Sequence, residues 1–437
     1  MKPTSTQAEA RARGRAVRTA LAAFAAVSLA AAACNTLDDA LNVDAPGRLP
    51  GDSLDDPTYA PLLVSGAVAD FDCALGSFVV MGGLVTDELI DATQTADRWP
   101  YDRRNVQSSD GRYGTSTCEN LGVYTPIATA RWSADNALAK LQGWTDAQMP
   151  AGTSRAELIA VAAAYSAYSR VLLGEMFCTA AIDTGPELTS RQILEQAEER
   201  FGQAIDAATV AGDQSLLNMS LVGRARVRLD LSQYDASKKA LALADAQRVP
   251  AGFVRSTTAS SASSRRENRV FSQNNTSQNV TVDPAFRGLA FGGVADPRVR
   301  VADTGKKATD GQQIWIQNKY AGLTSGIPIA TGREAQLIAA EVQGGQAAVD
   351  IINALHTAAG LPAFSSADPA AIQAQVAEER RRELFLQGNR LYDVNRLHVN
   401  LTPVAGTAYP KGGTYGTTVC LPVPDIERLN NPNFPRT

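Results

Sequence analysis

The sequence predicts a mostly α-helical protein in which a stack of helix–turn–helix units carries a loop-rich C-terminal part. Helix-starting residues recur along the chain, as at Ser154 and Thr189, each followed three residues later by Glu or Gln in a capping box. Apolar residues in the segments that follow recur at intervals of three and four, the spacing of one helix face. With 437 residues, 44% of them hydrophobic, the chain can bury a large core as one or two domains.

Residues 1–33 form a predicted export leader that is not part of the fold. Four arginines between positions 11 and 18 precede an apolar stretch, 19–33, that is too short to span a bilayer as a stable helix. Small residues lead up to Cys34, as at a bacterial lipoprotein cleavage site, so we expect a signal peptide and lipidation of Cys34. A strict lipoprotein box has leucine three residues before the cysteine, where this chain has Ala31. Ordinary secretory cleavage therefore stays open as the alternative.

The cysteine count agrees with an exported, lipidated chain. Of the five cysteines, Cys34 would carry the lipid, and the other four could form disulfides in an oxidising compartment. Four cysteines allow three pairings and the sequence does not choose among them; we expect Cys73–Cys118 and Cys178–Cys420. The chain has no C-x-x-C motif and only two histidines, so no zinc site, other metal, cofactor or His-based catalytic centre is expected.

The net charge of the chain is −4, which gives no indication of a basic surface that would bind nucleic acid.

The part that follows the leader is expected to begin as an extended segment, residues 34–57, in which Asp, Asn, Pro and Gly interrupt every apolar run. A first helix is predicted over Tyr59–Asp70, and a second apolar segment over Phe78–Ile90. The second holds two adjacent carboxylates, Asp87 and Glu88, which invite comparison with the paired acids of glycoside hydrolases. Adjacent residues on a helix point about 100° apart and do not face each other across a cleft. We therefore predict no catalytic role for them, and keep hydrolysis as an alternative.

A polar, turn-rich segment, Ala92–Gly122, is the first candidate binding region. It contains Trp99 and Tyr101 among charged neighbours, in the run D-R-W-P-Y-D. An exposed aromatic ring can stack on the face of a sugar, and flanking carboxylates and guanidinium groups can hydrogen-bond to its hydroxyls, so this run could form a ligand platform. Each ring could equally be a packing aromatic at the edge of the core.

The middle of the chain is predicted to be a helical-repeat scaffold. Helices are expected, in order, over residues 125–143, 154–177, 190–208, 213–229 and 232–247, with a further hairpin over 333–342 and 346–359. The short turns, and the alanine and glycine at close-packing positions, resemble tetratricopeptide repeats in a degenerate form. An apolar stripe at helical spacing belongs to a core, so no ligand site is predicted in this scaffold.

Two stretches between the helical blocks differ from them in composition. Arg255–Asp283 is rich in Ser, Asn, Gln, Thr and Arg, so we expect a long surface loop or partly mobile insertion that builds no core and could serve binding. Gln313–Tyr320 is predicted as a short strand. Trp315 and Tyr320 are the second pair of ligand-binding candidates, chosen for their expected exposure and not for a motif. Ordinary packing is the alternative for both.

Glu378–Leu397 is the most specific stretch of the chain, with the sequence E-E-R-R-R-E-L-F-L-Q-G-N-R-L-Y-D-V-N-R-L. It follows Asp368-Pro369, an N-cap with proline at the first helical position, so a helix can run from there up to Gly388. Gly388 is placed as the left-handed residue that ends this helix, and a second short helix is expected over 389–398. Opposite charges three and four positions apart support the helix, and a solvated surface face is what the charge pattern alone favours.

The spelling of this stretch resembles the C-terminal signature of the RagB/SusD family of outer-membrane nutrient-binding lipoproteins, E-R-R-x-E-L-x-x-E-G-x-R-x-x-D-L-x-R. The agreeing positions are Glu379, Arg380, Arg381, Glu383, Leu384, Gly388, Arg390, Asp393 and Arg396. Gln387 stands where the family often has glutamate. Shorter stretches, Leu41–Pro46, Asp296–Arg298 and Cys420–Asp425, also resemble family segments. In that family the motif braces helices and does not touch the ligand, so the resemblance implies a structural role for these charges.

The resemblance implies a SusD-like fold, in which the tetratricopeptide-like scaffold has the loop-rich C-terminal part packed on it. It also implies a division of the chain. The expected parts are a lipoprotein signal peptide at 1–33, a post-anchor segment at 34–57, an N-terminal helical region at 58–250 and a C-terminal region at 251–437.

A non-catalytic function is implied as well. Proteins of this family are lipid-anchored in the outer membrane facing the exterior, bind a nutrient, and hand it to a TonB-dependent, SusC-like transporter. The expected ligand is a glycan, another oligosaccharide or a peptide. An aromatic content of 6% is low for a sugar-binding protein and keeps peptides open. In studied members an aromatic from the part of the chain that here holds Trp99 contacts the ligand. The alternative is an exported helical-repeat scaffold that binds a protein partner.

Overall fold

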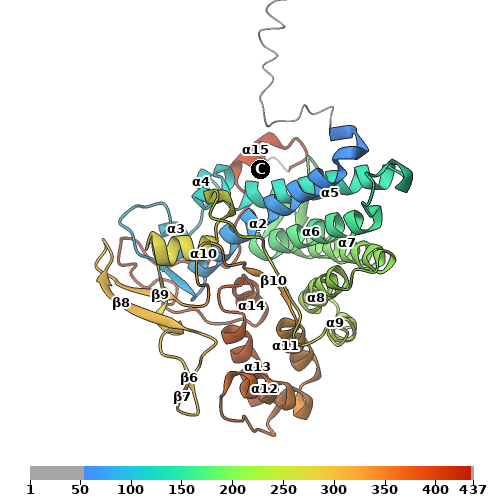
Figure 1. Ribbon diagram of the computed structural model, residues 1–437. Helices are drawn as coiled ribbons and strands as arrows, with labels where there is room; N and C mark the ends of the chain where they lie inside the picture. The colour runs from blue at the N-terminus through green and yellow to red at the C-terminus, as the bar shows by residue number, and fades with distance from the viewer. Residues whose placement is uncertain (1–53, 435–437) are drawn as a thin grey trace, which may run out of the picture. The chain divides into compact units, whose positions relative to one another are not determined.

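Helices dominate the protein, as predicted, in a computed structural model that describes residues 54–434 (Figure 1). The main helices are α2 (Ala60–Val85), α5 (Tyr124–Gly143), α6 (Arg155–Met176), α7 (Ser190–Ala211), α8 (Gln214–Leu231), α9 (Lys238–Ala246), α11 (Gly332–Gln343), α12 (Gly345–Ala359), α13 (Pro369–Glu383), α14 (Arg390–Arg396) and α15 (Asp425–Asn430). Three short helices, α3 (Trp99–Asp102), α4 (Gly111–Thr115) and α10 (Arg269–Phe271), lie in the connecting loops. The predicted signal peptide, the lipidation residue Cys34 and residues 35–53 lie outside the described residues.

The strands in the described part of the chain are short and form antiparallel pairs. The pairs are β1 (Leu89–Asp91) with β5 (Val280–Val282), β2 (Thr179–Ala181) with β3 (Glu187–Thr189), β4 (Val254–Ser256) with β10 (Pro328–Thr331), β6 (Ala290–Phe291) with β7 (Val294–Ala295), and β8 (Val301–Lys307) with β9 (Gln313–Gln317). The hairpin of β8 and β9 lies at the left of Figure 1, away from the helical stack. The predicted strand at Gln313–Tyr320 is β9, three residues shorter than expected.

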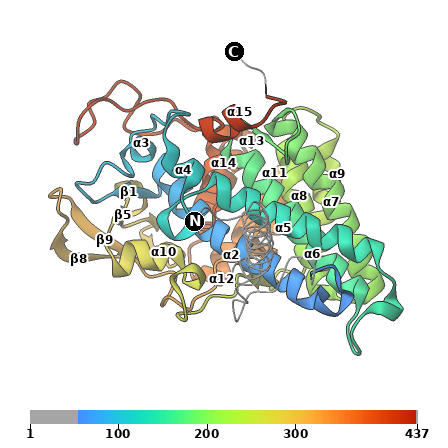
Figure 2. The same ribbon diagram turned by 90° about the horizontal axis from the view of Figure 1, so that it is seen from above.

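Helices α5, α6, α7 and α8 pack side by side in chain order, and α9 follows on α8 (Figure 2). Local sequence sets their ends. Thr189 and Gln192 form the predicted capping box at the start of α7, and Gly212, at φ 72°, ends that helix in the left-handed conformation. Gly223 lies where an added Cβ would come within 2.2 Å of the Phe201 ring, so glycine allows α8 to approach α7. This stack is the predicted tetratricopeptide-like scaffold.

Helix α2 is continuous over 26 residues, whereas the sequence analysis predicts a helix that ends at Asp70 and a separate apolar segment. The intervening residues contain no proline, and Phe71 and Phe78 are fully buried, so core packing carries the helix through. It ends at Thr86, whose hydroxyl donates to the Gly82 carbonyl at 2.9 Å. Asp87 and Glu88 therefore lie beyond the helix, in the connection to β1.

Two described helical stretches, Pro57–Val85 and Arg155–Met176, are long and apolar enough to cross a membrane. Most of each is buried inside the body, because α2 and α6 pack against α5 and against one another. Their hydrophobicity is therefore that of core helices.

Arg255–Asp283 builds part of the core, so the prediction of a coreless surface loop is wrong. Val270, Val280 and Val282 are fully buried, the last two in strand β5. The side-chain amide of Asn274, also fully buried, donates to two backbone carbonyls at 2.8 and 3.0 Å. Polar side chains that satisfy buried backbone groups allow a polar stretch to enter the core, which composition alone does not reveal.

The charged residues of Glu378–Leu397, here called the charged motif, join helices across the core. The guanidinium group of Arg380 on α13 donates to Asp393 on α14 at 2.9–3.1 Å, and Arg396 donates to the same carboxylate at 3.0 Å. Arg396 also pairs with Glu341 on α11. Arg380 is 4% exposed and Asp393 5%, so these residues form a buried network and not the solvated face that the charge pattern alone favours.

Gly388 has φ 90°, as its predicted role requires, and an added Cβ there would come within 3.0 Å of the Phe78 ring. Helix α13 ends earlier than predicted, at Glu383, because Leu386 already takes a positive φ of 54°. The turn between α13 and α14 therefore packs closely on α2.

The structure pairs the cysteines as Cys73–Cys118 and Cys178–Cys420. The second disulfide joins the end of α6 to the C-terminal segment, 242 residues further along the chain. The described residues from Asp55 onward group as a single compact unit, and its main hydrophobic cluster includes side chains from Ala67 to Leu421. The predicted boundary near residue 250 stays a prediction about sequence regions.

Candidate functional site

Three segments that are far apart in the sequence meet at the buried carboxylate of Asp91, at the end of β1. Arg98 donates to Asp91 Oδ1 at 2.9 Å, and Lys411 Nζ donates to Oδ2 at 2.7 Å. Lys411 also forms an ion pair with Asp310 at 2.8 Å. Because these groups are largely buried, the loop after β1, the turn between β8 and β9, and the C-terminal loop are fixed relative to one another.

A cavity of about 600 Å³, here called the Tyr409 cavity, lies beside this anchor. Its lining residues are Thr86, Leu89, Ile90, Asp102, Arg104, Asp283, Pro284, Ala285, Gln312, Thr402, Pro403, Tyr409, Pro410 and Tyr415. Aliphatic and proline side chains supply apolar walls, two tyrosines supply rings, and carboxylates, a guanidinium group and an amide supply hydrogen-bonding atoms. The volume lies within the range of about 300–1,000 Å³ that is common for small-molecule sites.

The tyrosines and Arg104 hold one another in place. The hydroxyl of Tyr409 donates to Asp102 Oδ2 at 2.7 Å, and its ring meets the ring of Tyr415 edge-on, with centroids 5.3 Å apart. The guanidinium carbon of Arg104 lies 4.9 Å from the Tyr415 ring centroid, and Arg104 also donates to the Pro403 carbonyl. Arg104 takes a φ of 53°, which is strained for a residue with a long side chain. Such strain is concentrated at functional sites.

Burial changes the protonation of the two carboxyl groups in this cavity. It raises the pKa of Asp102 to about 7, against the lowering effect of the Tyr409 hydroxyl and Lys411. It likewise raises the pKa of Asp283 to about 6. Near neutral pH Asp102 is therefore partly protonated, and its carboxyl group can donate as well as accept hydrogen bonds. A ligand rich in hydroxyls offers both kinds of partner.

The structure does not bring the four predicted ligand-binding aromatics into one site. Tyr101 and Tyr320 are buried, 2% and 5% exposed, so their expected exposure is wrong. The Tyr320 hydroxyl donates to the Leu386 carbonyl at 2.7 Å, which makes it a packing residue. Trp99 and Trp315 are half-buried, and neither lines the Tyr409 cavity. A ligand role for these two tryptophans stays a prediction.

Tyr101 lines a second cavity, of about 420 Å³. The other lining residues are mostly polar: Met81, Asp97, Arg98, Arg112, Ser116, Glu119, Asn120, Leu121, Gln273 and Asn279. Since Asp102 lines the Tyr409 cavity, the short helix α3 contributes a side chain to each cavity. The segment that the sequence analysis selects as a binding region thus reaches two cavities, but through Asp102 and Tyr101 and not through the ring of Trp99.

The adjacent acids Asp87 and Glu88 are occupied by structural contacts. Arg390 on α14 holds Asp87 in a two-pronged ion pair, at 2.7 and 2.6 Å. Glu88 is 1% exposed and accepts the Leu386 backbone N–H at 2.7 Å. The two side chains therefore brace α14 and the turn before it against the end of α2, and they do not form a pair of acids facing a substrate.

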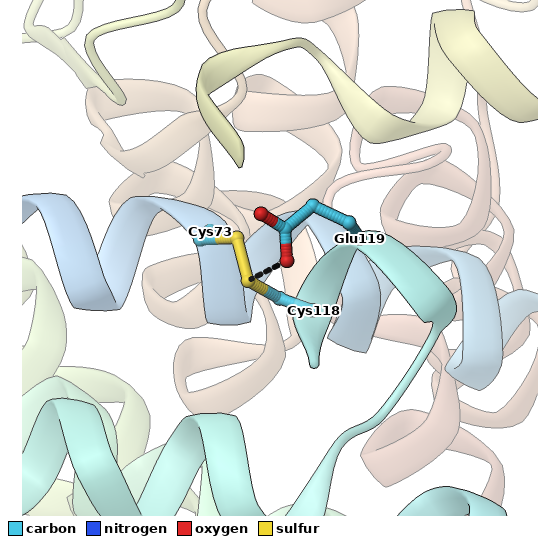
Figure 3. A group of neighbouring side chains, drawn as sticks. All are labelled: Cys73, Cys118 and Glu119. Atoms are coloured by element: carbon cyan, nitrogen blue, oxygen red, sulfur yellow. Dashed lines mark hydrogen bonds between the residues drawn. A yellow bond between two sulfur atoms is a disulfide. The ribbon is translucent and has the colours of Figure 1, made fainter. Parts of the chain in front are cut away.

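Figure 3 shows the one group of possible metal ligands in the described part of the chain, Cys73, Cys118 and Glu119. The two sulfur atoms are joined in a disulfide, so neither is a thiolate that could bind a metal ion. Glu119 alone remains, which does not make a metal site.

Sequence reasoning missed Arg104, Tyr409 and Tyr415. The two tyrosines stand in the run G-T-A-Y-P-K-G-G-T-Y-G, which has no helical or strand periodicity. The sequence nevertheless indicated that these tyrosines are packed, because a large aromatic ring in a glycine-rich loop needs other side chains to bury it. The same reasoning applies to Trp99 in its polar loop.

Comparison with known proteins agrees with the architecture. Residues 334–426, which include the charged motif, match the model of the SusD family. A SusD-like carbohydrate-binding protein from Bacteroides vulgatus superposes with a TM-score of 0.65 at 15% identity, over 86% of this chain and 96% of that one. The surface glycan-binding protein A from Bacteroides thetaiotaomicron gives 0.65 at 14% identity, over 86% and 97%. A laminarin-binding SusD-like protein gives 0.62 at 16%, over 86% and 98%. No curated protein sequence matches.

At these identities the superpositions establish the fold, which is that of the SusD-like proteins. The sequence match is confined to residues 334–426 and shows that this C-terminal part resembles the SusD family.

Proposed function

We propose that the protein captures a glycan in the Tyr409 cavity and passes it to a TonB-dependent transporter, as a lipoprotein on the outer face of the outer membrane. The lining of the cavity carries the ligand part of this proposal. The rings of Tyr409 and Tyr415 are 4% and 9% exposed, so they form part of the apolar wall and do not present open faces. Asp102, Arg104, Asp283 and Gln312 offer hydrogen-bonding atoms to sugar hydroxyls. Structural relatives that bear the names of glycan-binding proteins support the same ligand class.

The proposed location in the outer membrane is inferred from the N-terminal sequence. The leader and Cys34 lie outside the described residues, and the proposal is that Cys34 carries the lipid that anchors the protein. The SusC-like transporter is proposed from the resemblance of the C-terminal part to the SusD family.

Ligand binding is tested by affinity electrophoresis of the purified protein in gels that contain laminarin, amylopectin, xylan or mannan. We expect at least one polysaccharide to slow its migration relative to a gel without polysaccharide. Incubation with that polysaccharide should release no reducing ends. Release of reducing ends that is lost in Asp87→Asn would overturn the non-catalytic assignment in favour of hydrolysis.

The transporter part is tested separately, by co-purification from outer membranes in mild detergent through a C-terminal tag, followed by mass spectrometry. We expect a stoichiometric TonB-dependent barrel that is lost in Cys34→Ala. A protein that is unlipidated, soluble and recovered alone would favour the exported scaffold instead.

A further inference from the structure

A third cavity, of about 380 Å³, lies at the other end of α2 from the Tyr409 cavity. We call it the Val68 cavity. Its walls come from the first turns of α2 and of α6, and include Pro61, Val64, Val68, Leu158 and Val161. These five residues are apolar, and Ala69 adds a methyl group, whereas Ser65, Asp72 and Thr258 add polar atoms to the lining. The cavity is large enough for a small organic ligand, since such sites begin at about 300 Å³.

Sugars do not suit these walls. A hydroxyl group that leaves water without gaining a hydrogen bond costs free energy, and the apolar side chains that make up most of the lining offer no partner for the several hydroxyls of a sugar. A hydrocarbon chain gains roughly 0.8 kcal/mol for each CH₂ group that it buries. The walls therefore select a ligand with an apolar body, a different class from that of the Tyr409 cavity.

The rim of the cavity is cationic. Arg265 and Arg266 lie on it, in the polar segment that follows β4. Arg265 forms an ion pair with Asp70. Arg266 is exposed and forms no ion pair with any residue in the described range, 54–434. Its guanidinium group is therefore available to an anion at the mouth of the cavity.

One acidic group, Asp72, also lines the cavity. It accepts the Thr258 backbone N–H at 2.8 Å, and it is half-buried. Burial raises the pKa of Asp72 to about 7, with Arg255 and Arg266 acting in the opposite direction. Asp72 therefore opposes an anionic ligand less than an ordinary aspartate would near neutral pH, and the free charge at the rim is that of Arg266.

We propose that the Val68 cavity binds an amphipathic monocarboxylate, with its hydrocarbon chain between α2 and α6 and its carboxylate against Arg266. The ligand class follows from the aliphatic walls and the unpaired guanidinium group together, because either feature alone would accept a wider range of molecules. This site is independent of the glycan site, so either proposal can fail without the other.

The test uses three probes of equal chain length, octanoate, octanol and octylamine, and isothermal titration calorimetry on the full protein at pH 6, where Asp72 is mostly protonated. We expect octanoate to bind best, with octanol about fivefold weaker and octylamine weaker still, because only the carboxylate gains an ion pair of about 1 kcal/mol. Equal or tighter binding of octylamine, or no binding of octanoate, would overturn the proposal.

Two variants locate the site. Arg266→Gln should weaken octanoate about fivefold and leave octanol unchanged. Arg248→Gln replaces an exposed arginine in the turn after α9 and should alter neither. Ala69→Phe places a ring in the mouth of the cavity from an exposed position and should abolish binding of both probes. Its control is Ala244→Phe, an exposed alanine on α9. Octanoate affinity that is unchanged in both Arg266→Gln and Ala69→Phe rules the site out.

Discussion

The side chains of the Tyr409 cavity include a buried carboxyl group that forms no ion pair with any residue between 54 and 434. Asp102 is 5% exposed, and burial raises its pKa to about 7. The folded protein therefore keeps a proton on Asp102 at pH values at which the unfolded chain, with an ordinary pKa of 3.8, has lost it. Such a group contributes stability that is fully present below about pH 4 and is lost as the pH rises through about 7.

The substitution Asp102→Asn removes this pH dependence. Between pH 5 and pH 8 the free energy of unfolding of the wild type should fall by roughly 2 kcal/mol relative to that of the variant. Urea unfolding of both proteins at the two pH values measures the difference. Asp350→Asn, on an exposed face of α12, serves as the control and should follow the wild type. A wild-type-to-variant difference that is equal at pH 5 and pH 8 would contradict the assigned protonation.

Single residues of the site were only partly predictable. The sequence placed the candidate site near Trp99 and Tyr101, and α3 does reach two cavities. Tyr409 and Tyr415 could not be placed, because they come from a loop some 300 residues away in the chain whose position depends on the Lys411–Asp91 ion pair. Tyr320 was misjudged because a strand pattern does not show which face another segment will cover.

Among the elements, α13 and α14 depend on one another through buried charges. Asp393 accepts from both Arg380 and Arg396, and all three side chains are largely buried. The arginines hold the pKa of Asp393 below its usual range, despite its burial. Removal of one partner from such a network leaves buried charges without a counter-charge, which costs more than the ion pair itself contributes.

Asp393→Asn should therefore lower the free energy of unfolding by about 3 kcal/mol, measured by urea denaturation at pH 7. The control variant is Glu378→Gln, in the same charged stretch, Glu378–Leu397. Glu378 pairs with Arg381 and Arg382 but is considerably more exposed, so its loss should cost about 1 kcal/mol or less. If the two variants were equally stable, the motif would not be the buried brace described here.

The helices were easier to predict than the binding site, because the residues that start and end a helix lie next to it in the sequence. The caps at Ser154, Thr189 and Asp368 hydrogen-bond to backbone N–H groups as the sequence predicts. The errors lie where tertiary packing overrides local signals. Helix α2 runs on past Asp70 because its neighbours bury it, and Asn274 allows a polar segment to enter the core.

On the scale of the whole molecule, the Cys178–Cys420 disulfide connects the helical scaffold to the segment that ends the chain. Its loop is 242 residues long, so it restricts the unfolded chain strongly. Because Cys178 is exposed, replacement by serine removes little packing. The double variant Cys178→Ser/Cys420→Ser should lose about 3–5 kcal/mol in urea unfolding under oxidising conditions. A loss below about 1 kcal/mol would show that the disulfide does not restrain the unfolded chain.

The central claim is that a glycan binds in the Tyr409 cavity, and affinity electrophoresis of three proteins tests it most directly. The wild type, Tyr415→Ala and Tyr234→Ala are run in the polysaccharide gels described above. Tyr415 lines the cavity, whereas Tyr234 is an exposed tyrosine, 50% accessible, on the remote scaffold. We expect one polysaccharide to slow the wild type and Tyr234→Ala, and Tyr415→Ala to bind it about tenfold less tightly. Equal retardation of all three proteins, or of none in any gel, would contradict it.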